Sequence, residues 1–468
     1  MSPFKRQPLF GNVRHIHIVG IGGIGMSAIA DLLLHRGFTV SGSDRRLSEI
    51  TERLQSRGAS IFQGHHPDHI DGAHVVVHTS AVKADENPET AEAQKRGIPV
   101  IKRAEILSEL MQRKFSIGVA GTHGKTTTTT MTAQVVQAGG FDPSAIVGGR
   151  VQAFQRTNSL AGEGDIVVVE ADEFDRTFLQ LPADIAIITN IEIEHVDIYA
   201  DLDDLKSAFT QFAQGVPFYG SVILCLDDPH AASLLPHLDR RTITYGFDPA
   251  ARLRATDLRP DGFYTHFSVL LDNQPLGEVR LKAPGRHNVQ NALAAVAVGL
   301  ELGMPFPEIQ QGLATYDGIL RRFHCQADRG DILIIDDYAH HPTEVAATLS
   351  AARSGFPDKR LIAIFQPHLY SRTREFHAHF GQALTAADLL FITDVYPSRE
   401  APLPGITGEL VAHEARRLGH PDVRYVPSLH DLPSLLAELA APGDLFVTLG
   451  AGDIDRVGRH LATLLPHS

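Results

Sequence analysis

The sequence predicts an α/β protein in which parallel sheets alternate with helices and the chain folds into three domains. Short apolar segments of strand length recur along it, and most are followed by a glycine-containing or polar turn and then by a segment with helical periodicity. A chain of 468 residues is also too long for one hydrophobic core, and about three domains of ordinary size account for it. Both observations indicate a doubly wound architecture that is repeated along the chain.

The predicted domains begin where an apolar strand opens a new run of elements, which gives 1–113, 114–326 and 327–468. We expect the N-terminal and C-terminal domains to be Rossmann-like. We expect the central domain to resemble a P-loop ATPase, with a parallel sheet and a small antiparallel part at 253–281.

The individual elements follow from local pattern. Expected strands are short runs rich in valine, isoleucine and leucine. They are residues 15–20, 39–43, 75–78, 165–170, 185–190, 221–226, 332–335, 361–365, 389–393 and 445–449. Expected helices have apolar or alanine residues at three- and four-residue spacing. They are residues 26–36, 50–57 and 289–302.

Composition excludes several classes of protein. Apolar residues make 43% of the chain and charged residues 21%, and no run of 18 apolar residues occurs, so we expect no membrane insertion. The N-terminus lacks the apolar segment of a signal peptide. The two cysteines lie far apart in the sequence and cannot form a disulfide framework. Both observations lead us to expect a cytoplasmic protein. The net charge of -13 argues against nucleic acid as a partner. We expect a monomer or homodimer.

The most informative motif is an apolar strand end at 117–120 that runs through Gly121-Thr-His-Gly124 into Lys125 and Thr126. Glycines allow backbone N–H groups to approach an anion, and the N-terminus of the following helix supplies positive potential. The lysine can reach terminal phosphates, and the threonine hydroxyl can bind Mg²⁺. The motif therefore favours a nucleoside triphosphate site, although a strand-to-helix turn without a ligand is the alternative.

A second glycine-rich turn lies in the first domain. Residues 19–25 read Val-Gly-Ile-Gly-Gly-Ile-Gly, after one expected strand and before one expected helix, and Asp44 ends the next strand. Such a turn binds a pyrophosphate at the helix N-terminus, and the acid accepts a hydrogen bond from a ribose hydroxyl. The pattern indicates a bound nucleoside diphosphate and does not specify nicotinamide; close packing of strand and helix is the alternative.

Polar side chains also follow two strands of the second domain. Glu170 ends one expected strand, whereas Asn190 and His195 follow the next. The carboxyl ends of parallel strands meet at one edge of a sheet, so these groups should lie beside the Gly-Lys-Thr turn. We expect Mg²⁺ there, held by Thr126, Glu170 and His195, although Mg²⁺ prefers oxygen ligands and a hydrogen-bonding role for His195 stays open.

Seven motifs together resemble the Mur ligases, over about residues 15–453. They are Gly20-Ile-Gly-Gly-Ile-Gly-Met-Ser27, Gly121-Thr-His-Gly-Lys-Thr-Thr127, Glu170-Ala-Asp-Glu173, Asn190-Ile-Glu-Ile-Glu-His-Val-Asp197, Gly285-Arg-His-Asn-Val-Gln-Asn291, Asp337-Tyr-Ala-His-His-Pro-Thr-Glu344 and Gln366-Pro-His-Leu-Tyr-Ser-Arg-Thr373. The resemblance implies a domain for a UDP-sugar, a central ATPase and a domain for an amino acid. It further implies ATP and Mg²⁺ as cofactors, and an amide bond formed through an acyl phosphate between the lactyl carboxylate of UDP-N-acetylmuramate and L-alanine.

The resemblance also implies a role for particular residues. Those implied for catalysis are Lys125, His195, Arg322, His340 and Arg372. Those implied for ATP are Gly121, Thr122, His123, Gly124, Lys125, Thr126, Thr127, His287, Asn288, Arg322 and Asp337. Those implied for the UDP-sugar and the amino acid are Gly22, Gly23, Ile24, Gly25, Asp44, Thr79, Ser80, Tyr338, His340 and Arg372.

Within this set, Lys125 is expected to stabilise the transferred phosphoryl group, and Arg322 or Arg321 to approach an ATP phosphate. Arg372 is expected to bind the carboxylate of the amino acid, and His340 to position its amine. Many members of the family have arginine where this chain has Leu369, which leaves the choice among L-alanine, glycine and L-serine open.

Two alternatives remain open at the level of sequence. A recycling ligase that joins a preformed tripeptide to UDP-N-acetylmuramate would share the first two domains and differ in the third, where a tripeptide needs an open pocket. A non-enzymatic module that senses NAD and ATP would share the two glycine-rich turns. The candidate metal ligands, and the histidines and arginines of the third domain, favour an enzyme.

Overall fold

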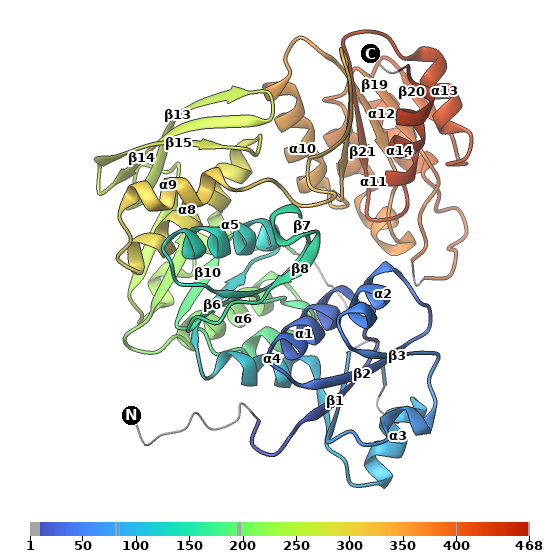
Figure 1. The fold of residues 1–468 in the computed structure, drawn as a ribbon. Helices are drawn as coiled ribbons and strands as arrows, with labels where there is room; N and C mark the ends of the chain where they lie inside the picture. Colours follow the sequence, from blue (N-terminus) through green and yellow to red (C-terminus); the bar gives the residue numbers. More distant parts are fainter. Residues whose placement is uncertain (1–9, 80–81, 84, 194–197, 399, 467–468) are drawn as a thin grey trace. The chain divides into compact units, whose positions relative to one another are not determined.

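The structure, a computed structural model, describes residues 10–79, 82–83, 85–193, 198–398 and 400–466. Three sheets form within this part of the chain (Figure 1). They are mainly parallel and alternate with helices, so the predicted α/β class is confirmed. The chain divides into two compact units, of which the first holds 1–256, 268–277 and 290–316 and the second holds the rest. The predicted boundaries at 113 and 326 stay predictions.

The N-terminal sheet has five strands in the order β3-β2-β1-β4-β5, and every pair in it is parallel. This is the doubly wound order of a Rossmann fold without its sixth strand, and the order reverses between β1 and β4. The predicted strands and helices are present, whereas the short, partly exposed edge strands β3 and β5 were not predicted. The elements are β1 (His15–Val19), α1 (Ile24–His35), β2 (Thr39–Asp44), α2 (Glu49–Ser56), β3 (Ser60–Gln63), η1 (Pro67–Ile70), β4 (Val75–His78), α3 (Pro88–Lys95), β5 (Val100–Lys102) and α4 (Arg103–Met111).

The central sheet has ten strands in the order β15-β14-β13-β12-β11-β10-β6-β9-β7-β8. Its inner strands are parallel, and Asp272 and Asn273 both have positive φ in the tight turn that joins β14 to β15. The elements are β6 (Phe115–Ala120), α5 (Lys125–Ala138), β7 (Ser144–Val151), η2 (Gln152–Phe154), β8 (Thr157–Leu160), β9 (Ile166–Glu170), η3 (Phe174–Gln180), β10 (Ile185–Ile188), α6 (Leu202–Gln214), β11 (Ser221–Cys225), α7 (Pro229–Ala232), η4 (Leu235–His237), β12 (Thr242–Gly246), β13 (Leu253–Asp261), β14 (Tyr264–Leu271), β15 (Gln274–Leu281), α8 (Arg286–Glu301) and α9 (Phe306–Ala314).

The third sheet has six strands in the order β16-β17-β21-β18-β19-β20, and only β16 is antiparallel to its neighbour. Strand β16 was not predicted, because a hairpin edge strand carries only a weak apolar pattern. The elements are β16 (His324–Arg329), β17 (Ile332–Asp337), α10 (Pro342–Gly355), β18 (Arg360–Phe365), α11 (Tyr370–Leu384), β19 (Leu389–Ile392), α12 (Glu409–Arg417), β20 (Val423–Tyr425), α13 (Leu432–Leu439), β21 (Asp444–Leu449) and α14 (Asp455–Leu464).

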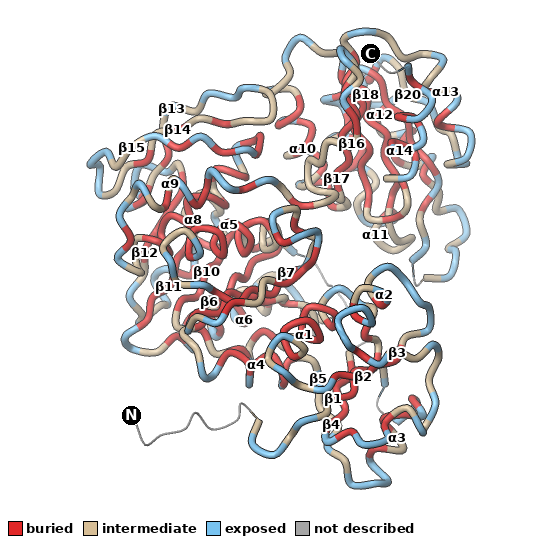
Figure 2. The backbone as a smooth tube through the Cα atoms, viewed as in Figure 1, coloured by how far each residue is buried: buried red, intermediate tan, exposed pale blue. Residues whose placement is uncertain are grey.

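The inner strands of all three sheets are buried along most of their length (Figure 2). Helices cover both faces of a doubly wound sheet, so its strands read as continuous apolar runs, as in Ile166-Val-Val-Val. The apolar runs of the sequence are therefore the sheet interiors. Among the described residues, no helix combines the length and the apolar character that a bilayer crossing requires.

Helix α1 contacts strands β7 and β8 of the central sheet, within the first compact unit. Asp31 of α1 is buried and accepts hydrogen bonds from Arg53 Nη1 at 2.6 Å, Arg57 Nη1 at 3.0 Å and Ser159 Oγ at 3.1 Å. Because a buried carboxylate needs such partners, this network fixes α1, and with it the first glycine-rich turn, against β8.

Candidate active site

The Gly-Lys-Thr turn lies between the end of β6 and the start of α5, and two of its positions require glycine. Gly121 and Gly124 have φ of +134° and +83°. A Cβ atom on Gly121 would lie 2.0 Å from Thr189 Oγ1, and one on Gly124 would lie 2.5 Å from Asn291 Oδ1. The turn therefore needs both the conformational freedom and the small volume of glycine.

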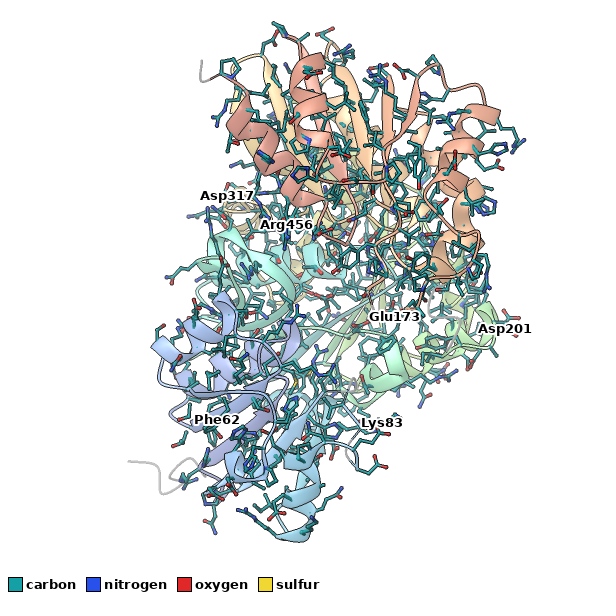
Figure 3. The ribbon with its side chains drawn as sticks, turned by 90° about the vertical axis from the view of Figure 1, so that its right-hand side faces the viewer. Phe62, Lys83, Glu173, Asp201, Asp317 and Arg456 are labelled. Carbon is teal, nitrogen blue, oxygen red and sulfur yellow. The ribbon has the colours of Figure 1, made fainter. Side chains whose placement is uncertain are left out.

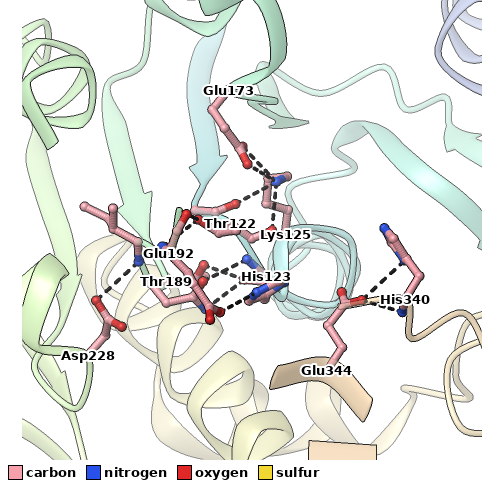
Figure 4. Close-up of polar contacts among 12 residues, drawn as sticks. Thr122, His123, Lys125, Glu173, Thr189, Glu192, Asp228, His340 and Glu344 are labelled. Atoms are coloured by element: carbon pink, nitrogen blue, oxygen red, sulfur yellow. Dashed lines mark hydrogen bonds and ion pairs between the residues drawn. The ribbon is translucent and has the colours of Figure 1, made fainter. Parts of the chain in front are cut away.

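Residues that follow β10 hold this turn in place (Figure 4). Asn190 accepts from the backbone N–H of Thr122 at 3.0 Å and from that of His123 at 2.8 Å. Thr189 Oγ1 donates to the His123 carbonyl at 2.7 Å, and His123 Nε2 lies 2.8 Å from Glu192 Oε2. The first N–H groups of α5 have no acceptor within the helix, so they remain available to an anion.

Lys125, the first residue of α5, forms a buried ion pair with Glu173 (Figure 4). Its Nζ donates to the two Glu173 carboxylate oxygens at 3.0 and 2.7 Å, and to the carbonyls of Gly121 at 2.7 Å and Thr122 at 3.1 Å. Burial opposes the lysine charge, but Glu173 and Asp172 raise its pKa above the ordinary value. Burial raises the pKa of Glu173 to about 7. Lys125 therefore stays charged, with its ammonium group beside the backbone of the turn.

Thr126 and Glu170 lie together, as predicted from their positions at a helix start and a strand end. Thr126 Oγ1 donates to Glu170 Oε1 at 3.2 Å, and the Gly148 N–H donates to Glu170 Oε2 at 2.6 Å. Burial raises the pKa of Glu170, which a nearby cation would counteract. The hydroxyl and carboxylate oxygens fit the preference of Mg²⁺ for oxygen ligands. His195, the third expected ligand, lies outside the described residues.

The glycine-rich turn of the N-terminal sheet lies between β1 and α1. The Gly22 N–H donates to Asp44 Oδ2 at 3.0 Å, and a Cβ atom on Gly22 would lie 2.9 Å from the same oxygen. Gly20 has φ of +78°, and a Cβ there would approach Thr79 Cγ2 at 3.1 Å. Thus Asp44 and Thr79 both border the turn, whereas Ser80 lies outside the described residues. Gly23, Ile24 and Gly25 form the start of α1.

A buried network beneath Asp44 was not predicted. Glu89 of α3 is fully buried and accepts from Ser43 Oγ at 2.5 Å and contacts His69 Nδ1 at 2.7 Å. Phe62, which is labelled in Figure 3, stacks on His69 with ring centroids 4.2 Å apart. Burial opposes ionisation of Glu89, but the His17 ring 3.6 Å away and the contacts with Ser43 and His69 hold its pKa at about 2. The network fixes the end of β2, where Asp44 lies.

In the second unit, Asp337 ends β17 and accepts two backbone hydrogen bonds, from Phe323 N at 2.7 Å and from Ala339 N at 2.8 Å. Burial raises its pKa to about 6, although Arg322 opposes that shift. The two backbone bonds fix the turns on either side of this strand. Asp337 therefore holds the backbone next to Arg322 in place, in addition to any contact that it makes with a nucleotide.

Arg321 and Arg322 differ in their surroundings. Arg321 donates to Asp336 Oδ2 at 3.1 Å and to the carbonyls of Gly450 at 2.6 Å and Gly452 at 2.9 Å. Arg322 Nη1 lies 3.4 Å from Glu344 Oε1, at the start of α10. Arg321 therefore joins the ends of β17 and β21, which makes Arg322 the better candidate for a phosphate contact.

Glu344 also positions His340 (Figure 4). The His340 backbone N–H donates to Glu344 Oε2 at 3.0 Å, and His340 Nδ1 lies 2.9 Å from the Tyr338 carbonyl. A carbonyl only accepts, so Nδ1 carries the proton of a neutral ring and Nε2 is the basic nitrogen. Arg372 is half-buried in the first turn of α11, three residues after Leu369, which has φ of +68°.

The two predicted adenine-side residues lie at the start of α8. Asn288 Nδ2 donates to the Pro284 carbonyl at 2.7 Å and so closes the first turn of the helix. Burial lowers the pKa of His287 to about 4, and Arg322 lowers it further, so this ring is neutral at pH 7. A neutral ring suits contact with an uncharged base.

Three side chains of the quoted motifs contact these residues, although no role was assigned to them from the sequence. Glu173 pairs with Lys125, Asn291 contacts Gly124, and Glu344 contacts His340. The local signals were their places at the ends of these motifs and their positions: Glu173 follows β9 by three residues, and Glu344 lies four residues after His340. Such signals are weak, because acids close to strand ends and helix starts commonly act as caps.

The chain matches three domain families along its length. These are the Mur ligase family, catalytic domain, over residues 15–115; the Mur ligase middle domain over residues 119–299; and the Mur ligase, glutamate ligase domain over residues 321–452. The chain therefore belongs to the Mur ligase family, and it is an ATP-dependent ligase.

The chain is also similar to individual proteins whose names specify a reaction. The chain is 52% identical to a UDP-N-acetylmuramate–L-alanine ligase of Salinibacter ruber, over 99% of this chain and 98% of the relative. It is 49% identical to one of a Geobacter species, over 96% of this chain and 97% of the relative. Among solved structures, a UDP-N-acetylmuramate–alanine ligase of Thermotoga maritima has a TM-score of 0.81 at 31% identity, over 96% of this chain and 98% of that one. A murein peptide ligase of Psychrobacter arcticus has a TM-score of 0.68 at 26% identity, with the same coverage.

Proposed function

We propose that the chain joins L-alanine to UDP-N-acetylmuramate in peptidoglycan precursor synthesis, with ATP as the source of energy. The observation that carries this activity is the match, at about half identity and over nearly the whole chain, to relatives named for it. The match includes the third sheet, where the amino acid is expected. The solved peptide ligase is less similar than the solved alanine ligase, so the tripeptide alternative is not favoured. Because the enzyme needs ATP as a substrate, and ATP is supplied in the cytoplasm, we infer that it acts there.

The reaction has two chemical stages. The lactyl carboxylate attacks the γ-phosphorus of ATP and forms an acyl phosphate, with ADP as the leaving group. The amine of L-alanine then attacks the acyl carbon, and phosphate leaves from the tetrahedral intermediate. Both stages bring anions together, so the site must neutralise negative charge before either bond can form.

The residues of the Gly-Lys-Thr turn suit the first stage. Lys125 is charged and buried beside the phosphate-binding N–H groups, and we assign it to the transferred phosphoryl group. Thr126 and Glu170 would hold Mg²⁺, since their oxygen atoms lie 3.2 Å apart. When bound, Mg²⁺ supplies positive charge that lowers the repulsion between phosphate and carboxylate. Glu173 keeps the Lys125 ammonium beside the turn.

The residues of the third sheet suit the second stage. We assign Arg372 to the carboxylate of L-alanine, because a guanidinium binds a carboxylate through two parallel hydrogen bonds. We assign His340 to the amine, which must be neutral to attack, and the basic Nε2 of this ring can accept its proton. Tyr338 contributes the carbonyl that sets the His340 tautomer, and Asp337 and Arg322 are assigned to the nucleotide.

Phosphate release from ATP tests the proposal directly. The assay contains Mg²⁺ and UDP-N-acetylmuramate and compares L-alanine, glycine, L-serine and an L-Ala-D-Glu-diamino acid tripeptide, with product mass to identify the amide. We expect release that requires the sugar nucleotide and is fastest with L-alanine. Fastest release with the tripeptide would assign the chain to recycling, and no sugar-dependent release with any acceptor would contradict the proposal.

A further inference from the structure

Arg103 lies with its side chain against the first glycine-rich turn. It is the first residue of α4 and follows β5, whose carboxyl end lies on the same edge of the parallel sheet as the carboxyl end of β1. A Cβ atom on Gly25 would lie 2.6 Å from Arg103 Cζ and 2.9 Å from its Nη2. The guanidinium therefore packs directly on the backbone of Gly25, which only glycine permits.

The charge of Arg103 has no counterion within the described part of the chain. Its Nε atom is buried and donates to none of the described residues, and no carboxylate among them pairs with the guanidinium. Arg321, by contrast, has a carboxylate and two carbonyls as partners. A buried guanidinium nitrogen without an acceptor is costly, so its position beside an anion-binding turn indicates a ligand that supplies the acceptor.

Arg103 also lines a small, partly open cavity of about 50 Å³. Lys102 and Arg103 border it at the start of α4, and Glu170 and Asp172 border it at the end of β9. Leu107 and Phe178 contribute apolar walls. The guanidinium thus contacts the glycine-rich turn and shares a cavity with Glu170.

We propose that Arg103 binds the pyrophosphate of the UDP-sugar and so directs the lactyl carboxylate toward Glu170 and Lys125. This inference rests on the proposed function, since it concerns how that substrate is held. The N–H groups of Ile24 and Gly25, at the start of α1, have no acceptor within the helix and can bind the pyrophosphate. Arg103 adds a charged, planar donor beside them. Arg103 is a binding and positioning residue and takes no part in bond formation.

The test measures binding by calorimetry for wild type, Arg103→Met and Arg103→Lys. The probes are uridine, UDP, UDP-N-acetylglucosamine and UDP-N-acetylmuramate. We expect Arg103→Met to weaken all three pyrophosphate ligands by about tenfold to a hundredfold, because a charged hydrogen bond is lost, and to leave uridine unchanged. Arg103→Lys should restore part of the affinity. Arg96→Met, which removes an exposed arginine paired with Asp71 and Glu92, is the control and should change none of them.

Two results would overturn the inference. Equal affinity of wild type and Arg103→Met for UDP would exclude a pyrophosphate contact. A loss confined to UDP-N-acetylmuramate would instead assign Arg103 to the lactyl carboxylate.

A second variant tests the inference in case Arg103→Met does not fold. Gly25→Ala should displace the guanidinium and weaken UDP more than uridine, whereas an equal loss for both would again contradict the inference. Retained uridine and ATP binding shows that each variant is folded. Turnover by wild type is measured separately, so that failure of the proposed function is distinguished from failure of the Arg103 assignment.

Discussion

Gly124→Ala should damage both the stability of the chain and its use of ATP. Gly124 has φ of +83°, which costs a residue with a side chain about 1–2 kcal/mol. The new Cβ would also lie 2.5 Å from Asn291 Oδ1, where an ordinary contact begins near 3.4 Å, so a shift of about 0.9 Å is needed. Asn291 accepts from Thr128 Oγ1 at 3.1 Å, and loss of that bond adds about 1 kcal/mol.

The free energy of unfolding should therefore fall by about 2–3 kcal/mol, as measured by urea denaturation. Because a displacement of about 1 Å in a positioning element can cost about 100-fold, kcat/KM for ATP should fall by about that factor. The affinity for UDP should not change. Gly140→Ala is a matched control, since Gly140 has φ of +76° just after the same helix but no described atom lies within 4 Å of the Cβ that alanine would add there. The loss of unfolding free energy in Gly140→Ala therefore measures only the cost of a positive φ at an alanine.

The reasoning fails if Gly124→Ala is no more destabilising than Gly140→Ala, because the contact with Asn291 would then carry no cost. A double variant, Gly124→Ala with Asn291→Ala, should recover part of the kcat/KM for ATP that the single variant loses. If the double variant is as impaired as the single one, the clash is not the cause of the defect.

Three further predictions concern the assigned residues. Lys125→Met should lower phosphate release by about 1,000-fold and leave UDP binding intact; equal loss of both would contradict separate sites. Glu170→Gln should raise the Mg²⁺ concentration needed for half-maximal rate without changing the KM for UDP-N-acetylmuramate, and an unchanged Mg²⁺ dependence would exclude this carboxylate as a ligand. Burial raises the pKa of Asp337 in the folded chain from the ordinary 3.8 to about 6. The protonated side chain therefore stabilises the fold fully below pH 3.8, and this contribution is lost as the pH rises through 6. The difference in unfolding free energy between wild type and Asp337→Asn should therefore fall by about 2 kcal/mol from about pH 4 to pH 7, and a constant difference would refute the shift.

Most of the fold could be predicted from the sequence, because a strand buried on both faces must be apolar along its length. The segments around β1, β6 and β9 show this pattern clearly, and the turns that follow them carry the glycines and polar residues of the candidate site. Edge strands such as β5 and β16 escaped prediction. β5 has only three residues, and β16 is partly exposed along most of its length, so little apolar periodicity marks either strand.

The sequence by itself determined the class of protein and the local chemistry of each motif, since a glycine turn followed by a lysine and a threonine acts through its immediate neighbours. It could not determine partners that are distant along the chain. Only the tertiary structure decided that Glu173 pairs with Lys125, that Asn291 requires glycine at position 124, and that Arg103 lies on Gly25. Contacts of this kind depend on how parallel strands bring their ends to one edge of a sheet, and side-chain spacing along the chain does not record that arrangement.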